Sequence, residues 1–367
     1  MSREILVSSG EASGDRMAAL VLQALGTRVQ GHGMGGPASA AAGLVELVPR
    51  DFHGVMGIAR VARHAPSILS AYRTLLAWAD DARPGAALLV GFTDFHQHLG
   101  RALRRRGVPV LWCAAPQVWA WRPSRLDTLH TCADRLAVVL PFEERLWRQA
   151  GHAAGYVGHP ALDSCRWNDS PTRRLAVLCG SREQEVRATS AALIDAARLW
   201  VRSRPSWSAD VLVAASLSEQ ATSHLGLMAR DAGLSIVRCS ALQGAAAALA
   251  DYDVALCASG TASLEAALSA TPPVVAYRTH ALLRLAAWAL LQTPDIALPN
   301  VVLGRRAFPE IVQDRLDSRE LLEALEAVVA HRSRCIDACA RLNERMRVDD
   351  GRTFGDRVAQ MLDGLMR

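Results

Sequence analysis

The sequence predicts an α/β protein of two Rossmann-like domains, each on a doubly wound parallel sheet, with a cleft between them and a helical C-terminal tail. Strand-like apolar runs alternate with helical stretches, which is the pattern of βαβ units. The chain has 367 residues, more than one hydrophobic core usually holds. A polar, turn-forming segment at 166–171 interrupts the alternation, which then restarts. We therefore expect domains at 1–166 and 167–345, with a helix in 346–367 that packs back on the first domain.

The strands are expected where short apolar, β-branched runs are bounded by turn residues. In the first half these are 4–8, 86–91, 109–113, 135–139 and 154–158, and in the second half 174–179, 209–215, 235–238, 252–258 and 273–277. Residues 319–366 have the pattern of two or three helices without a strand. Ligands of doubly wound sheets bind beyond the carboxyl ends of the strands, where a helix begins with unpaired backbone N–H groups. Functional residues are therefore expected in the turns that follow strands.

The basic residues exclude several kinds of chemistry. All 41 positions counted as lysine or arginine are arginine. A Walker-type nucleotide site, a pyridoxal phosphate enzyme and a protein kinase each need a lysine, so these three classes are excluded. The net charge is only +5, and the densest basic run, Arg104, Arg105 and Arg106, has no interleaved aromatic residues. No nucleic-acid partner is expected, whereas attraction to anionic lipid or phosphate stays open.

The cysteine pattern indicates whether a metal site is expected, and the apolar runs indicate where in the cell the protein is expected. The eight cysteines are scattered, and the closest pair, Cys335 and Cys339, has helical spacing rather than that of a zinc site. We therefore expect buried thiols and no metal site. The sequence opens without the apolar stretch of a secretory signal, and no run of about 18 apolar residues lacks an ionisable group. We therefore expect a cytoplasmic protein without a membrane span.

Two glycine-rich segments lie near the start. SGEASGD at 9–15 follows the first strand, and its glycines let the backbone bend close to a ligand. Ser13 or Asp15 would cap a helix from about Arg16, so a ligand-binding turn and a purely structural turn both stay open. The cluster at 31–37 contains GxGxxG, but the stretch before it is too short and polar for the strand of a dinucleotide site. We interpret it as a loop on the acceptor side.

Two further turns of the first domain carry candidate functional groups. Strand 86–91 leads into FTDFH, which places Asp94 at a carboxyl end where it would act as a general base. The alternative is that Asp94 only caps the following helix. PQVWAWR at 116–122 follows the next strand, and its tryptophans would form an aromatic wall for a sugar or an acyl chain. The alternative is that they pack in the core.

The second domain has two similar turns. CGSREQE at 179–185 joins a strand to a helix and offers a glycine, a helix terminus and an arginine, which suits a diphosphate. SGTASLE at 259–265 repeats the arrangement, and Glu265 would bind a ribose. A structural cap is the alternative for each turn, but two such turns in a chain without lysine favour a nucleoside diphosphate. The polar set from Asn300 to Gln313 carries little information alone.

Taken together, these segments resemble the lipid-A-disaccharide synthase family. The matching segments are GEASGD at 10–15, GGP at 35–37, VMG at 55–57, DF at 94–95, VWAWR at 118–122, FE at 142–143, VGHP at 157–160, GSR at 180–182 with EV at 185–186, SGTASLE at 259–265, PN at 299–300, and Gly304, Arg305, Glu310 and Gln313. They follow the family order from residue 4 to about 315.

The resemblance implies a two-domain GT-B fold and an inverting transfer. UDP-2,3-diacylglucosamine would be the donor and 2,3-diacylglucosamine 1-phosphate the acceptor, giving the β-1′,6-linked lipid A disaccharide and UDP. The UDP-sugar is a substrate, so no cofactor is implied, and helix dipoles and arginine would replace a metal. The implied partners are these acylated substrates and the inner-leaflet surface, bound peripherally. A homo-oligomer stays open.

The resemblance also implies roles for individual residues. Asp94 and Arg182 would be catalytic. The donor site would comprise Gly180, Ser181, Arg182, Glu185, Ser259, Gly260, Thr261, Ser263, Glu265, Asn300, Arg305, Glu310 and Gln313. The acceptor or acyl site would comprise Gly10, Glu11, Ser13, Asp15, Gly35, Gly36, Met56, Gln117, Trp119, Trp121 and Arg122.

The chain departs from the family pattern at three positions. Gly91 stands where the family usually has an aspartate, Cys179 where it has a proline, and Ala115 where it often has a serine. The first departure would lower the activity or alter the acceptor, but the retained Asp94 and Arg182 predict an active enzyme. Two alternatives stay open: a UDP-N-acetylglucosamine 2-epimerase-like enzyme on a GT-B scaffold, and a catalytically degenerate lipid or nucleotide binder.

A membrane-docking segment is predicted at 55–78. Its apolar stripe comprises Ile68, Leu69, Tyr72, Leu75 and Leu76, and its basic residues comprise Arg60, Arg63, His64 and Arg73. Pro66 is expected to break the segment into two helices. The alternative is an ordinary core-facing helix with a solvated basic side.

Overall fold

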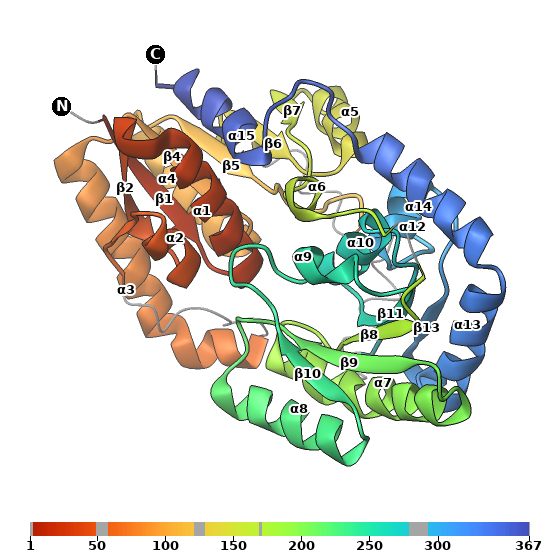
Figure 1. Cartoon of the computed structure of the whole chain (residues 1–367). Coiled ribbons are helices and arrows are strands. Elements are labelled where there is room, and N and C mark those ends of the chain that lie inside the picture. Colours follow the sequence, from red (N-terminus) through yellow and green to blue (C-terminus); the bar gives the residue numbers. More distant parts are fainter. Residues whose placement is uncertain (1–2, 49–57, 121–128, 169–170, 279–292, 367) are drawn as a thin grey trace. The chain divides into compact units, whose positions relative to one another are not determined.

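The computed structural model describes residues 3–48, 58–120, 129–168, 171–278 and 293–366. The chain divides into two compact units, which are described separately (Figure 1). Unit 1 comprises residues 1–160 and 348–367, and unit 2 comprises residues 161–347. The chain therefore enters unit 2 once and returns to unit 1 for its last helix.

Unit 1 is built on a seven-stranded sheet of order β3-β2-β1-β4-β5-β6-β7, whose paired strands all run parallel. The strands are β1 (Arg3–Ser9), β2 (Val29–Met34), β3 (Val45–Glu46), β4 (Ala86–Val90), β5 (Val110–Cys113), β6 (Arg135–Val138) and β7 (Ala154–Tyr156). After β3 the chain returns to the other side of β1. The strand order therefore reverses between β1 and β4, which is where doubly wound sheets bind ligands.

Helices cover both faces of this sheet. They are α1 (Ala12–Leu25), α2 (Pro37–Ala41), α3 (Ile58–Ala82), α4 (Thr93–Arg105), α5 (Pro141–Gln149) and α15 (Phe354–Asp363). Strand β4 is buried at all five residues, as a parallel strand covered on both faces should be. On one face Leu6 and Trp112 pack in a single cluster with Leu75 of α3 and Leu99 of α4.

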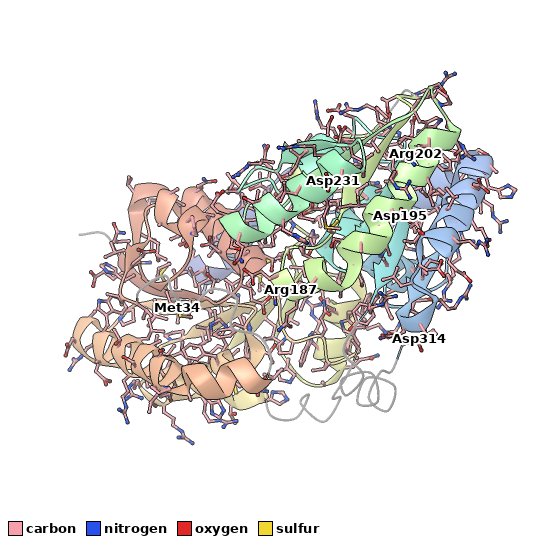
Figure 2. All side chains as sticks on the ribbon, turned by 90° about the horizontal axis from the view of Figure 1, so that it is seen from below. Met34, Arg187, Asp195, Arg202, Asp231 and Asp314 are labelled. Carbon is pink, nitrogen blue, oxygen red and sulfur yellow. The ribbon has the colours of Figure 1, made fainter. Side chains whose placement is uncertain are left out.

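Unit 2 has a six-stranded parallel sheet of order β10-β9-β8-β11-β12-β13. Its strands are β8 (Arg174–Leu178), β9 (Ser208–Val213), β10 (Ser235–Arg238), β11 (Val254–Ala258), β12 (Pro273–Tyr277) and β13 (Glu310–Val312). Its helices are α6 (Ala161–Ser164), α7 (Glu183–Ser203), α8 (Glu219–Asp231), α9 (Ala246–Leu249), α10 (Thr261–Leu268), α12 (Leu298–Leu303), α13 (Ser318–Ala330) and α14 (Arg332–Met346). Along α7, Arg187, Asp195 and Arg202 lie on the outer side (Figure 2). The strand order reverses between β8 and β11.

The prediction of two parallel-sheet α/β domains is confirmed, and every expected strand is present within one or two residues of its predicted bounds. Three strands were missed. β2 has the sequence VQGHGM, whose glycines have low strand propensity, β3 has only two residues, and β13 was interpreted as part of a polar set. The pairing of each with a buried neighbouring strand decides its conformation, and the sequence alone does not show that pairing.

Two predicted helix boundaries are wrong. Helix α1 begins at Ala12 rather than near Arg16, so the glycine-rich segment forms its first turn. Pro66 does not break its segment, because α3 runs through it as one helix. Pro66 lies on the exposed side of α3. Water can there satisfy the carbonyl group that loses its N–H partner.

The apolar stripe of α3 faces the core, as the alternative interpretation held. Leu75 and Leu76 are buried in the core cluster, and Ile68 and Tyr72 pack against it. Only Leu69 of this stripe is exposed. The predicted membrane-facing stripe is therefore wrong. Val55, Met56 and the side chains of Arg60, Arg63 and His64 lie outside the described part of the structure. No helix in the described ranges has the length and apolar character needed to cross a bilayer.

The C-terminal helix α15 packs against α1 in unit 1, and the two helices lie side by side in Figure 1. The approach is close at Gly355, where an added Cβ would lie 2.4 Å from the carbonyl oxygen of Leu20. Arg357 adds a hydrogen bond of 3.1 Å to the carbonyl of Val157, just after β7. The final helix is therefore an integral part of the first sheet's covering layer.

We expect Gly355→Ala to lower the stability of unit 1 by about 1–3 kcal/mol, because its methyl group would meet a backbone atom that cannot move aside. Gly364→Ala is the matched control, since a Cβ there would have its nearest neighbour at 3.4 Å. Thermal unfolding of the two variants would measure the difference. Equal midpoints would show that α15 can shift without cost.

Candidate active site

The turns after β1 and β4 meet where the strand order of unit 1 reverses. Gly10 follows β1, and a Cβ at this position would lie 2.4 Å from the ring of Phe92, which follows β4. Glycine at position 10 therefore allows the two turns to touch. Glu11 is the N-cap residue of α1 without a side-chain cap bond, and Ser13 lies in its first turn. Ser13 is partly exposed at this edge of the sheet.

The turn from β4 to α4 places Asp94 at the same edge. Gly91 and Phe92 have φ angles of 59° and 45°, so two consecutive residues adopt the left-handed conformation before α4 begins. For Phe92 this conformation costs about 1–2 kcal/mol, and surrounding contacts must therefore stabilise the turn. Asp94 lies in the first turn of α4 and is exposed. The N-cap residue is Phe92, so the alternative interpretation of Asp94 as the cap is wrong.

Asp15, predicted in the acceptor site, is buried in α1 and turned toward the start of α2. Its carboxylate accepts hydrogen bonds from the N–H groups of Gly36 at 2.7 Å, Ala38 at 2.9 Å and Ser39 at 3.0 Å, and from the hydroxyl of Ser39. The side chain thus caps α2 from a neighbouring helix. It ties the first glycine-rich segment to Gly35 and Gly36 and shapes their loop.

The segment after β5 contains an aromatic side chain held by a buried acid. Trp119 donates from Nε1 to Oε1 of Glu143 at 2.9 Å, and its ring lies 5.2 Å from that of Phe142. Glu143 also accepts the N–H of Leu140 at 3.0 Å, and burial raises the pKa of its carboxyl to about 7. Sequence reasoning gave Glu143 no role beyond its place in the family pattern.

The remaining residues predicted on the acceptor side are either exposed or undescribed. Gln117 is exposed beside Trp119, whose ring is partly exposed. Trp121 and Arg122 lie outside the described residues, as does Met56. The described part of this segment therefore presents one amide and one indole at the carboxyl end of the sheet.

In unit 2, Arg182 is oriented at the start of α7 by Glu185. The Glu185 carboxylate accepts the N–H groups of Ser181 at 3.0 Å and Arg182 at 3.3 Å, and it pairs with Nη1 of Arg182 at 2.8 Å. The hydroxyl of Ser216 donates to the Ser181 carbonyl at 3.1 Å. The Arg182 side chain nevertheless keeps 45% of its surface exposed. The Glu185 carboxylate thus satisfies backbone N–H groups of the turn that follows Gly180. The Arg182 side chain remains accessible at the surface.

The second predicted donor turn begins α10. Gly260 is exposed with a φ of 150°, and Ser263 donates from its hydroxyl to the Gly260 carbonyl at 2.8 Å. Thr261 is partly exposed at the helix start, whereas Glu265 is buried one turn later. The hydroxyl of Ser259 lies 3.5 Å from the Ile296 carbonyl. The helix start therefore reaches the surface with its hydroxyl groups around it.

The late polar set forms a closed internal network. The amide nitrogen of Asn300 donates to the Phe308 carbonyl at 2.9 Å and to Oε1 of Glu310 at 2.8 Å, and its oxygen accepts the N–H of Phe308 at 2.9 Å. Glu310 also accepts the N–H groups of Ile296 and Ala297, each at 3.0 Å. Both side chains are buried, so they shape the loop, whereas Arg305 is exposed on it and Gln313 partly exposed.

The described residues offer no evident metal site. Within those ranges, no three His, Cys, Asp or Glu side chains lie close enough to hold an ion. All eight cysteines are free thiols, and burial raises the pKa of Cys113 and Cys179 to about 12. These thiols are protonated at neutral pH and are poor metal ligands.

Comparisons with known proteins relate the whole chain to one family. The family model described as lipid-A-disaccharide synthetase matches residues 5–350. The lipid-A-disaccharide synthase of Myxococcus xanthus is 33% identical, covering 88% of this chain and 87% of that protein. The enzyme of the same name from Solibacter usitatus is 35% identical, with coverage of 90% and 89%.

Solved structures resemble the chain in fold. The calicheamicin glycosyltransferase CalG4 matches with a TM-score of 0.61 at 15% identity, covering 100% of this chain and 98% of that one. MurG of Acinetobacter baumannii matches with a TM-score of 0.57 at 14% identity, covering 99% of both chains. The UDP-GlcNAc 2-epimerase of Neisseria meningitidis matches with a TM-score of 0.58 at 10% identity over the full length of both chains.

The glycosyltransferase neighbours confirm the GT-B fold. The 2-epimerase is similar in fold alone, and the sequence relatives do not favour that alternative. Since the family model spans nearly the whole chain and the relatives exceed 30% identity over most of it, the chain belongs to the lipid-A-disaccharide synthase family of glycosyltransferases.

Proposed function

We propose that this protein condenses UDP-2,3-diacylglucosamine with 2,3-diacylglucosamine 1-phosphate to give lipid A disaccharide 1-phosphate and UDP. The observation that carries the proposal is the exposed carboxylate of Asp94, in the first turn of α4 where the strand order of unit 1 reverses. A base at such an edge can meet a bound sugar hydroxyl. Family membership supplies the class of donor and acceptor.

In this proposal Asp94 accepts the proton of the acceptor 6-hydroxyl. The hydroxyl oxygen forms a bond to the anomeric carbon of the donor, and the bond from that carbon to the diphosphate oxygen breaks with its electron pair. Attack opposite to the leaving group inverts the anomeric centre. General-base assistance of this kind typically contributes about 10²- to 10⁴-fold to the rate.

Unit 2 would bind the donor through the starts of α7 and α10. Arg182, oriented by its 2.8 Å contact with Glu185, would bind the diphosphate and stabilise its charge as UDP leaves. The helix start, with Gly260 exposed and Thr261 partly exposed, supports an adjacent nucleotide contact. Glu265, which is buried one turn later, would serve the ribose from inside the helix start. No step of this scheme needs a metal or a cofactor.

The acylated substrates also bear on location. We propose that the protein works at the cytoplasmic side of the inner membrane and docks there reversibly. Because the stripe of α3 packs in the core, docking would have to use other residues. Leu69 and Arg73 remain exposed on that helix and suit contact with lipid and anionic headgroups.

We expect Asp94→Asn to lower kcat at least about a hundredfold while the KM for the donor stays similar, because the amide cannot accept the proton. His98→Ala is the matched control, since His98 is exposed on the same helix. UDP release and disaccharide formation would be followed by mass spectrometry. A kcat within tenfold of the parent would refute the role of Asp94 as base.

We expect Arg182→Lys to lower kcat/KM for the donor about tenfold to a hundredfold, because lysine cannot form the paired hydrogen bonds of a guanidinium group. Arg187→Lys is the control, five residues later on the exposed side of α7 (Figure 2). Equal donor kinetics for the two variants would exclude Arg182 from the diphosphate site.

A further inference from the structure

A buried histidine lies beneath the turn that carries Asp94. His96 is two residues further along α4 and has no exposed surface. Aromatic rings surround it: its ring centroid lies 5.6 Å from that of Phe92, 5.7 Å from that of Phe95 and 6.0 Å from that of Trp112. Sequence reasoning gave this residue no role.

Both ring nitrogens of His96 have polar partners. Nδ1 lies 2.7 Å from the carbonyl oxygen of Gly91, and Nε2 lies 2.9 Å from the hydroxyl oxygen of Ser8. A carbonyl oxygen can only accept a hydrogen bond, so the proton must be on Nδ1. Nε2 therefore accepts from the Ser8 hydroxyl, and the contacts select one neutral tautomer. Burial lowers the pKa of His96 to about 4, opposed by the hydrogen bond to Gly91, so the ring is neutral at physiological pH.

The backbone N–H and carbonyl groups of Gly91 form several hydrogen bonds. Its carbonyl also accepts from Nε1 of Trp112 at 3.2 Å, and its N–H donates to the Cys113 carbonyl at 3.0 Å. The N–H of His96 donates to the Phe92 carbonyl at 3.0 Å. His96 therefore contacts the left-handed turn through its side chain and its backbone.

We propose that His96 is a positioning residue that fixes the Gly91–Phe92 turn and thereby sets the direction of Asp94. The turn determines where α4 begins, and Asp94 is the second residue of that helix. Without the Nδ1–H donor, the Gly91 carbonyl loses one of the two side-chain hydrogen bonds described for it, and Asp94 loses its fixed orientation toward the acceptor. The inference rests on the proposed function, because it acts through Asp94 as base.

The first test replaces His96 with asparagine or with glutamine, whose side-chain amides lie at different distances from the backbone. The Nδ2–H of asparagine falls near the place of the histidine Nδ1–H, whereas the amide of glutamine falls near Nε2. We expect His96→Asn to keep kcat within about threefold of the parent. We expect His96→Gln to lower kcat at least about tenfold without raising the KM for the donor, which binds to unit 2. Similar kcat values for the two variants, both folded by circular dichroism, would overturn the proposal.

A double-mutant cycle distinguishes positioning from general stability. If His96 acts through Asp94, His96→Gln should change kcat less than about twofold once Asp94→Asn is present. An equal loss in both backgrounds would overturn the positioning role. If Asp94→Asn by itself leaves kcat within tenfold of the parent, the proposed base is wrong, which is a separate failure from that of His96.

A measurement on the parent protein needs no variant. ¹⁵N chemical shifts of the His96 ring at neutral pH should show a neutral imidazole with its proton on Nδ1. A ring protonated on Nε2 or on both nitrogens would contradict the contacts with Gly91 and Ser8. This result would overturn the proposal even if the glutamine variant failed to fold.

Discussion

The structure around the candidate base depends on how the Gly91–Phe92 peptide is held. Two consecutive left-handed residues join β4 to α4, and only the first is glycine, so the turn is unfavourable by itself. Ser8 on β1 and Trp112 on β5 contribute to its support, the first through His96 and the second directly. The position of Asp94 is thus determined jointly by three neighbouring strands and the helix that carries it.

Carboxylates build the other turns in a similar way, and those of Asp15 and Glu310 are buried. Asp15 accepts N–H groups at the start of α2, Glu185 at the start of α7, and Glu310 those of Ile296 and Ala297 just before α12. A helix start has backbone donors that need partners, and a carboxylate satisfies several at once. Acidic residues in the family motifs therefore fix loop shapes, and the neighbouring side chain of Arg182 is left exposed.

The backbone conformation at Gly91 bears on the departure from the family pattern at this position. A Cβ at this position would meet nothing within 4 Å, so the φ of 59° rather than a steric clash of the Cβ disfavours a side chain there. Aspartate tolerates this conformation better than most residues. Glycine adopts this conformation without strain, and the contacts of His96 and Trp112 with the Gly91 carbonyl use only the backbone.

The sequence by itself determined the alternation of strands and helices, the two-domain organisation and the family, because apolar periodicity and motif order are local properties of the chain. It also led to the prediction that Asp94 and Arg182 are catalytic, since each follows a strand end. Tertiary structure decided that β2 is a strand, that the stripe of α3 faces the core, and that Asp15 and Asn300 are saturated by internal hydrogen bonds. It also decided the tautomer of His96, because its partners come from β1 and the end of β4, and only folding brings Ser8 within 2.9 Å of its ring.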